Sequence, residues 1–512
     1  MPSCSRCARL AAPCCYDYVF TAPTTALVDH SESNGHPLSM KTSFSAPGPV
    51  INILDPDCDI SAGIIMNLLT SQSVDWRESV AVYFRTTNLW FSVVHHGRFS
   101  SRIEPEGGGG GSGSGSGSGA GGDPQDADLA LLVVCMHLIT QHADSGRPVL
   151  VNGTGMLAAP MYLAARRILG VMRANASATA GVELAQCAAL LGLYEFGHGD
   201  AIRAYVTIGD AYTTAKSLGV RPGKYAEGGE GVEVSLVEEE RRDLYWALLI
   251  VDRLIRVERR LMWKPFHVPT PVEDDLLPST NIIWDPAAGS PVTTTQHHPA
   301  GVHPSVTLGA FQRNCQCAIL FTRALHAWEG GGQGHNHPFP RSNSFAELDE
   351  ATRAIIEAML SQTSSWSEYY ECFAICTCLL LLLYCSFLRT VPADQVHPQS
   401  ADVDVAKAIA GINFTVRIIA DTTADLNDQL ARRPGMLTPC SSPVTPYGAY
   451  HSLSALSNFE TVIVDADARF HDVYSSLHFF AKRWGVAGQL VERIESFIAE
   501  KDENADHTFM FP

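Results

Sequence analysis

Three cysteines near the start of the chain have the residue type and spacing of zinc ligands. They are Cys4, Cys7 and Cys14, which form a C-x2-C-x6-C series. Cysteine thiolates are soft ligands that zinc holds in tetrahedral sites, and a C-x2-C pair places two of them within reach of one ion. The spacing therefore predicts zinc as the cofactor of this segment, on the condition that further ligands complete the site. Three thiolates cannot hold two zinc ions, so a binuclear site would need ligands beyond these.

A second group of cysteines lies in an apolar stretch in the C-terminal half. Cys372, Cys376 and Cys378 occur in or beside Phe373–Leu388. Two thiolates four residues apart share a helix face, but no Cys or His pair of matching spacing completes a tetrahedral site. A free cysteine in an apolar run packs as a small hydrophobic side chain. Core packing is therefore the preferred interpretation of these cysteines.

The same stretch raises the question of a membrane span. Phe373–Leu388 is shorter than the roughly twenty residues that a spanning helix needs. A helix that is apolar on all sides is also typical of the core of a large helical protein. We expect a buried core helix and no membrane partner. The chain also begins without the continuous apolar segment of a secretory signal, which predicts an intracellular protein.

A group of charged and aromatic residues near the middle of the chain is the second candidate site. It consists of Arg241, Arg242, Trp246, Asp252 and Arg253, set in an apolar run. These residues could form a ligand or switch site, or a buried ion pair and aromatic anchor. Charged side chains are rarely buried unless they are paired, and the structural interpretation is preferred. Arg242 and Asp252 are too far apart on one helix to pair directly, so each is expected to find a partner on another element.

Helical periodicity dominates the chain around these residues and predicts an all-α fold. Gly219 is expected to terminate the helix before it. No period-two strand series with hairpin turns is evident. A central helix is predicted with Glu238–Glu240 at its start, an apolar series from Leu244 to Ile255, and Arg259-Arg260 at its end. The other predicted helices are Val182–Phe196, Ile202–Ala215, Leu348–Leu360, Val403–Ala420 and Leu477–Phe497, the last broken near Gly485 or Gly488. Residues 286–305, 329–343 and 430–446 are predicted to be loops.

The N-terminal cysteines, with Pro2 before them and Tyr16 after them, resemble the second half of a fungal zinc binuclear cluster. That cluster uses six cysteines in two C-x2-C-x6-C halves. Cys4, Cys7 and Cys14 match one half, and the first half would lie upstream of Met1. The basic Cys-x2-Cys-Arg-x-x-Lys helix that contacts DNA in this family is also missing from the chain.

Most of the remaining chain resembles the fungal-specific transcription factor domain that accompanies such clusters. The resemblance is carried by Val82–Phe99, Ala188–Tyr194, Ile208–Ala211, Leu218–Val220, the group from Arg241 to Arg253, Ser441–Tyr450 and Arg483–Gly488, in that order. Where the family commonly continues with Gly-Arg-Pro, this chain has Met262-Trp263-Lys264-Pro265 and keeps only the proline. In this family the group from Arg241 to Arg253 looks structural.

The resemblance implies a domain organisation and a function. Residues 1–16 would be the cluster remnant, 17–45 a disordered linker, and 46–500 the all-α regulatory domain with a Gly/Ser insertion at 105–122. The implied function is transcription regulation in the nucleus, with DNA bound through a full-length N-terminal module. Transcription machinery or co-regulators would be further partners, and a homodimer is left open.

Composition limits how this chain could meet DNA. It has 36 basic and 54 acidic residues, a formal charge of −18. The phosphates of DNA repel a protein with this negative net charge, so any affinity for DNA must lie in a local basic module. The alternative function is an interaction protein or co-regulator without its own DNA-binding module. An all-α enzyme comes last, because the sequence has no P-loop, G-x-S-x-G, H-E-x-x-H or dinucleotide motif. We expect no catalytic residues.

Overall fold

The computed structural model describes residues 60–103, 126–141, 156–175, 181–224, 235–285, 290–329, 342–362, 369–432 and 442–503. All of them belong to one unit of the chain, Ile53–Pro512. The predicted zinc ligands Cys4, Cys7 and Cys14, the linker at 17–45 and the insertion at 105–122 lie outside the described residues.

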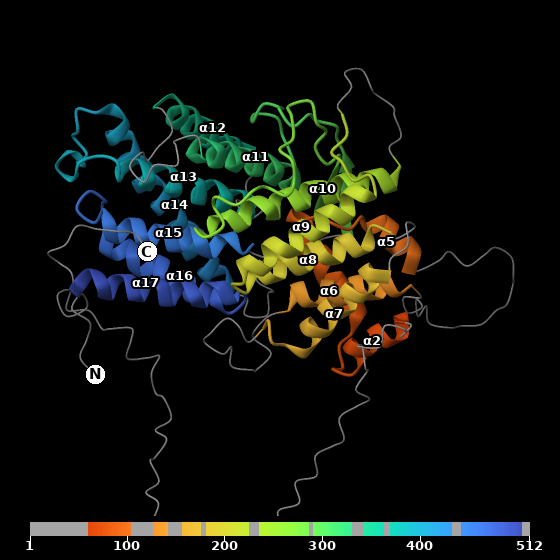
Figure 1. The fold of residues 1–512 in the computed structure, drawn as a ribbon. Helices are drawn as coiled ribbons and strands as arrows, with labels where there is room; N and C mark the ends of the chain where they lie inside the picture. Colours follow the sequence, from red (N-terminus) through yellow and green to blue (C-terminus); the bar gives the residue numbers. More distant parts are fainter. Residues whose placement is uncertain are drawn as a thin grey trace, which may run out of the picture. The chain divides into compact units, whose positions relative to one another are not determined.

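The described residues form two groups of helices (Figure 1). The first comprises α2 (Ala62–Thr70), α3 (Trp76–Arg85), α4 (Thr87–Trp90), α5 (His96–Ile103), α6 (Ala127–Thr140), α7 (Pro160–Asn175), α8 (Glu183–Gly197), α9 (Ala201–Ser217) and α10 (Leu236–Leu254), which continues into the short 3-10 helix η3 (Ile255–Val257). The second comprises α11 (Ala310–Glu329), α12 (Ser342–Gln362), α13 (Tyr370–Leu388), the 3-10 turn η5 (Ala393–Gln395), α14 (Val403–Arg432), α15 (Val444–Asn458), α16 (Ala466–Ala481) and α17 (Gly485–Glu503).

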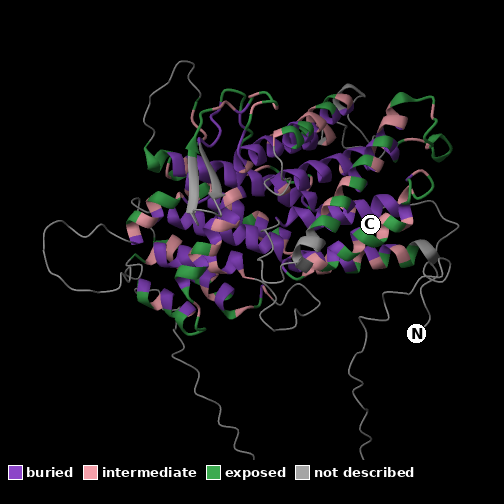
Figure 2. Ribbon diagram, turned by 180° about the vertical axis from the view of Figure 1, so that it is seen from behind, coloured by how far each residue is buried: buried purple, intermediate pink, exposed green. Residues whose placement is uncertain are grey.

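Each group is organised around a central helix. Helix α8 packs against α6, α7, α9 and α10, and every one of its residues is buried. Helix α13 packs against α11, α12, α14 and α15. Contacts of α10 with α11 and of α8 with α17 join the groups, and the buried apolar side chains of both form one continuous core. Figure 2 shows buried residues along the helices of both groups. The all-α prediction is confirmed.

Polar residues define the ends of the helices that matter for the candidate site. The Asp200 carboxylate accepts a hydrogen bond from the Arg203 amide at the start of α9, and the Ser235 hydroxyl accepts one from the Glu238 amide at the start of α10. Gly219 follows α9 with a φ of +76°, a left-handed conformation that glycine adopts without strain. The prediction that Gly219 terminates this helix is confirmed.

The apolar stretch Phe373–Leu388 forms most of α13 and is a core helix. By length and hydropathy α13 could cross a membrane, the one such helix in the described part of the chain. However, 83% of its apolar window is buried inside the domain, so neighbouring helices already cover it.

The predicted break near Gly485 is also confirmed, because α16 ends at Ala481 and α17 begins at Gly485.

A β-hairpin in the segment between α10 and α11 corrects the expectation that hairpins are absent. Strands β1 (Thr280–Asp285) and β2 (Ser290–Thr295) pair antiparallel, with Thr280 opposite Thr295 and Asp285 opposite Ser290. Apolar residues are consecutive rather than alternating in β1, and Pro291 lowers the strand signal of β2. The β-branched residues on both strands were the usable signal. The predicted loop 286–305 was therefore wrong over β2.

Two other predicted loops were too long. Helix α14 continues beyond Ala420 to Arg432, and α12 already begins at Ser342. Both extensions are polar helix ends, where a periodic apolar signal fades before the backbone hydrogen bonding does.

Candidate functional site

Helix α10 carries the whole group from Arg241 to Arg253 through the middle of the domain. Three glutamates in or just after its first turn, Glu238, Glu239 and Glu240, favour the helix start, where the backbone dipole is positive. Every residue from Arg242 to Leu254 is buried. Arg241 is half-buried, and its Nε has no hydrogen-bond partner among the described residues. The group is therefore a core element, and only Arg241 has access to solvent.

Arg242 joins α10 to two neighbouring segments. Its guanidinium pairs with the Glu239 carboxylate one helical turn earlier, at 2.5 Å. It also donates hydrogen bonds to the Ser279 hydroxyl and the Pro222 carbonyl, both at 3.0 Å. The prediction that its charged partner lies on another element was wrong, because the i−3 position on the same helix supplies it. The other elements supply neutral oxygens.

Trp246 anchors the same helix face one turn further on. Its side chain is completely buried, and its Nε1–H donates a 2.9 Å hydrogen bond to the Leu276 carbonyl. The neighbouring Tyr245 ring meets the indole edge-on, and the Tyr245 hydroxyl donates to the Pro269 carbonyl at 2.9 Å. These two bonds attach the segment before β1 to α10. The contacts of Trp246 are those of an aromatic anchor.

Asp252 is the centre of a fully buried ion cluster. Its carboxylate pairs with Arg253 and, at 2.8 Å, with Arg256, and all three side chains have no exposed surface. The same carboxylate accepts hydrogen bonds from the backbone amides of His267 and Val268, each at 3.1 Å. The charged partners again come from α10 and its continuation, against the prediction that they lie elsewhere.

The two arginines of this cluster fix the segment after η3 in place. Arg253 donates to the Thr322 hydroxyl on α11 and to the Val268 carbonyl, each at 2.8 Å. The Phe266 ring packs on both guanidinium groups, with its centroid 4.0 Å from Arg253 and 4.5 Å from Arg256. Burial lowers the pKa of Arg253 to about 10, so it remains charged at neutral pH. The cluster ties α10, α11 and the intervening segment together.

Sequence reasoning missed Glu239 and Arg256 as members of this network. A signal for both was available, because residues three or four apart on a helix are neighbours and these two are of opposite charge to Arg242 and Asp252. The amides of His267 and Val268 carry no such signal. They depend on how the chain returns to α10 after Pro265.

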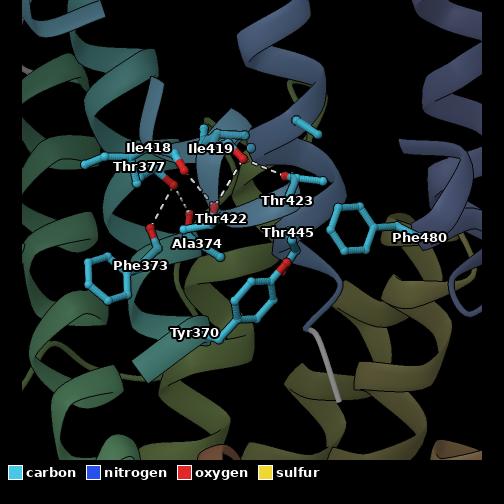
Figure 3. A pocket seen from close by; sticks show the side chains of 12 residues that line it. Tyr370, Phe373, Ala374, Thr377, Ile418, Ile419, Thr422, Thr423, Thr445 and Phe480 are labelled. Carbon is cyan, nitrogen blue, oxygen red and sulfur yellow. Dashed lines mark hydrogen bonds between the residues drawn. The ribbon is translucent and has the colours of Figure 1, made fainter. Parts of the chain in front are cut away.

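A pocket between α13, α14, α15 and α16 is too small for an organic ligand (Figure 3). Its cavity volume is about 30 Å³, enough for a single water molecule. Thr377 and Thr422 face it, yet their hydroxyls already donate to carbonyls of their own helices, Thr377 to Phe373 at 2.7 Å and Thr422 to Ile418 at 2.7 Å. This pocket is a packing gap between helices.

Glu371, at the start of α13, gives the domain a pH dependence that can be measured. Burial raises its pKa to about 8, although the Ser442 amide donates a 2.7 Å hydrogen bond to its carboxylate. A carboxyl whose pKa is higher in the folded state binds its proton more tightly there. Its contribution to the free energy of unfolding is therefore fully present below the unfolded pKa near 4.5 and is lost as pH rises towards 8.

We expect the free energy of unfolding to fall between pH 4.5 and 8 by at most about 1.4 kcal/mol per pH unit from this group. Glu371→Gln, which keeps an oxygen acceptor for the Ser442 amide, should flatten that slope. Urea unfolding at several pH values measures it. An unchanged slope in the variant would show that Glu371 does not titrate in this range.

The cysteines predicted to pack in the core do so. All eight described cysteines are buried and none is in a disulfide. Cys376 faces Cys317 across α13 and α11, with the two sulfurs 3.5 Å apart. Hydrogen bonds from the thiols of Cys372 and Cys376 hold the pKa of the Cys317 thiol well below its usual value. Among the described residues, no group of three His, Cys, Asp or Glu side chains could hold a metal ion.

We therefore expect the helical domain to keep its unfolding midpoint when metal is removed. Incubation with a zinc chelator followed by thermal unfolding monitored by circular dichroism tests this. Re-addition of zinc serves as the control for unspecific effects of the chelator. A large fall in the midpoint that zinc reverses would reveal a structural metal site outside residues 4–14.

No protein-family model matches the chain, and no curated protein is similar to it.

Proposed function

We propose that this chain is a transcription regulator of the zinc binuclear cluster kind, with a helical regulatory domain. The observation that carries the proposal is the conjunction of two features. Cys4, Cys7 and Cys14 have the spacing of half such a cluster. They precede an all-α domain in which helix α10 carries the buried group from Arg242 to Arg253.

In this proposal the two parts have different tasks. The N-terminal cysteines would bind zinc together with the other half of a cluster, and the cluster would hold a basic segment against DNA. The helical domain would carry regulation and partner binding. The contacts of Arg242, Trp246 and Asp252 support a structural role for this group, because all three residues are buried.

The proposal is tested by tagging the protein at its own gene and mapping its location. We expect nuclear accumulation and chromatin enrichment at a recurring short DNA sequence. Cysteine replacement at Cys4 and Cys7 should abolish the enrichment while the protein remains abundant. A co-regulator without a DNA-binding module would keep its chromatin sites after this replacement, because its partner would hold it there.

Residues 1–512 alone, without the other half of a cluster, should bind DNA weakly and without sequence preference. It has three of the six cysteines of a cluster and a formal charge of −18, which opposes approach to phosphate. Titration of labelled duplexes that contain CGG triplets, beside duplexes with the triplets scrambled, measures this at moderate salt. Sub-micromolar binding that distinguishes the two sets would contradict the prediction.

A further inference from the structure

A groove lies between α7 and α9 on the surface of the first helical group. Its two walls are tied together by hydrogen bonds, from Arg203 to the Tyr162 hydroxyl at 3.3 Å and from Arg173 to the Asp210 carbonyl at 3.0 Å. The bonded residues are 41 and 37 residues apart in sequence. Because the partner on α9 moves forward along the chain as the residue on α7 does, the two helices run in the same direction. Helix α8, buried along its length, packs against both.

Two hollows occupy this groove. The first, of about 370 Å³, is lined by Leu163, Arg166, Arg167 and Arg203. The second, of about 380 Å³, lies further along and has Arg173 in its wall and Leu184 of α8 among its lining residues. The hollows are open to solvent and more than ten times larger than the gap beside Thr377. A chain segment, rather than a single ion, matches their size.

The first hollow is rich in hydrogen-bond donors for an anion. Arg166 uses its Nη1 on the Tyr162 hydroxyl and on the buried carboxylate of Glu195, at 3.2 and 3.1 Å. Arg203 uses its Nη1 on Tyr162 and its Nε on Asp200. A guanidinium has five N–H donors in a fork that fits a carboxylate, so both arginines keep donors for a ligand.

Arg167 is the group most available to a ligand. It is exposed and makes no hydrogen bond or ion pair with any described residue. Helix α7 carries three arginines and no acidic residue, in a chain whose formal charge is −18. The paired arginines next to Arg167 are held in position by Tyr162 and Glu195, so little side-chain entropy remains to be lost when they bind.

Exposed apolar side chains border the arginines. Leu163 on α7 is 36% exposed, and Ile202 and Val206 on α9 are 57% and 52% exposed. Ile202 and Val206 are one turn apart and flank Arg203 in sequence. A border that combines apolar side chains with guanidinium groups suits a peptide that carries both apolar side chains and carboxylates.

We propose that the groove between α7 and α9 binds an acidic segment of a partner protein. In this arrangement, carboxylates of the segment accept hydrogen bonds from Arg166, Arg167 and Arg203, and its apolar side chains pack on Leu163 and Val206. The inference is independent of the proposed DNA binding, because it uses none of the N-terminal cysteines.

A nucleic acid is the less suitable occupant. Three acidic residues, Glu195, Asp200 and Asp210, already pair with arginines of the groove, which leaves Arg167 as its one unpaired guanidinium among the described residues. One such group and the spare donors of its neighbours suit a few peptide carboxylates, but not a row of phosphates. Tight unspecific binding to DNA depends on many such contacts. The exposed Ile202 and Val206 would also gain nothing from a phosphate backbone.

The test measures binding of a short fluorescein-labelled peptide in which Asp and Glu alternate with Leu and Phe. Fluorescence anisotropy with the full chain should show saturable binding that weakens as salt is raised. Arg167→Glu should weaken it by about tenfold or more, the loss expected when a charge in contact is reversed. Leu163→Ser should weaken it less. Arg417→Glu, at a site 70% exposed on α14, is the matched control and should leave binding unchanged.

Thermal unfolding of each variant establishes that it is folded, and Arg167→Glu removes no hydrogen bond or ion pair among the described residues. The proposal is overturned if the wild-type chain does not bind the peptide, or if Arg167→Glu and Arg417→Glu have equal effects. It is also overturned if a peptide with Asn and Gln in place of the acids binds equally well. Preference for a duplex DNA over the peptide, lost in Arg167→Glu, would assign the groove to nucleic acid instead.

Discussion

Replacing Asp252 by alanine is expected to lower the free energy of unfolding by about 3–5 kcal/mol, the usual cost of removing one partner from a buried ion pair. The Asp252 carboxylate is the one described group that forms salt bridges with Arg253 and Arg256. Without it, two guanidinium groups with no exposed surface would keep their charges in the core. The backbone amides of His267 and Val268 would also lose their acceptor.

A second variant separates the loss of the charge at Asp252 from the loss of its acceptor oxygens. Asp252→Asn keeps an oxygen for the two amides but removes the charge, so we expect an intermediate loss of stability. Asp421→Ala is the matched control, because Asp421 is 71% exposed and its pair with Arg417 spans 3.6 Å. Exposed pairs of this kind contribute about 0–1 kcal/mol. Urea unfolding followed by circular dichroism ranks the three variants.

A different ranking would change the interpretation of the cluster. If Asp252→Ala were no less stable than Asp421→Ala, the two arginines would have to be neutralised or solvated in the folded protein. The buried network would then be wrong, and the group from Arg241 to Arg253 would regain its interpretation as a ligand or switch site.

The course of α10 could be predicted from sequence because three local rules agree there. Ser235 caps the helix, acidic residues follow in the first turn, and apolar residues recur with helical period up to Ile255. That Trp246 would be buried followed from its apolar neighbours. The hydrogen bond to the Leu276 carbonyl did not, since no local pattern states which distant segment will pass beside the indole.

The hairpin and the ion pairs were missed for different physical reasons. Strands β1 and β2 pair with each other, and β1 also lies against α4 and α11, so their stability comes from tertiary packing that a periodicity test does not sense. Arg242 and Asp252 were assigned distant partners because they were compared with each other. Their helical neighbours Glu239 and Arg256 complete both pairs at the spacings that helix geometry favours.

The groove between α7 and α9 was beyond the reach of sequence reasoning. Arg203 on α9 is separated from Arg166 and Arg167 on α7 by α8 along the chain, and only the packing of α7 and α9 on α8 brings the three to one hollow. The sequence shows an arginine pair on a helix without acids. It does not show that Tyr162 binds arginines from two helices at once.

Truncation of Trp246 to alanine should be comparably damaging, at about 3–5 kcal/mol, because it empties a large volume in a core where few atoms can move to refill it. Domains are typically stable by only about 5–15 kcal/mol, so lower solubility and a lower unfolding midpoint are expected. Trp246→Phe keeps most of the ring but leaves the Leu276 carbonyl without its donor, which should cost about 1–3 kcal/mol. Trp263→Ala, at a side chain 59% exposed, is the control and should leave the midpoint close to that of the wild type. Thermal unfolding and soluble yield compare the three, and binding of DNA or of the acidic peptide is then measured on every variant that folds. A Trp246 variant with wild-type stability but altered binding would show that this residue acts in recognition, and that α10 is more than a structural element.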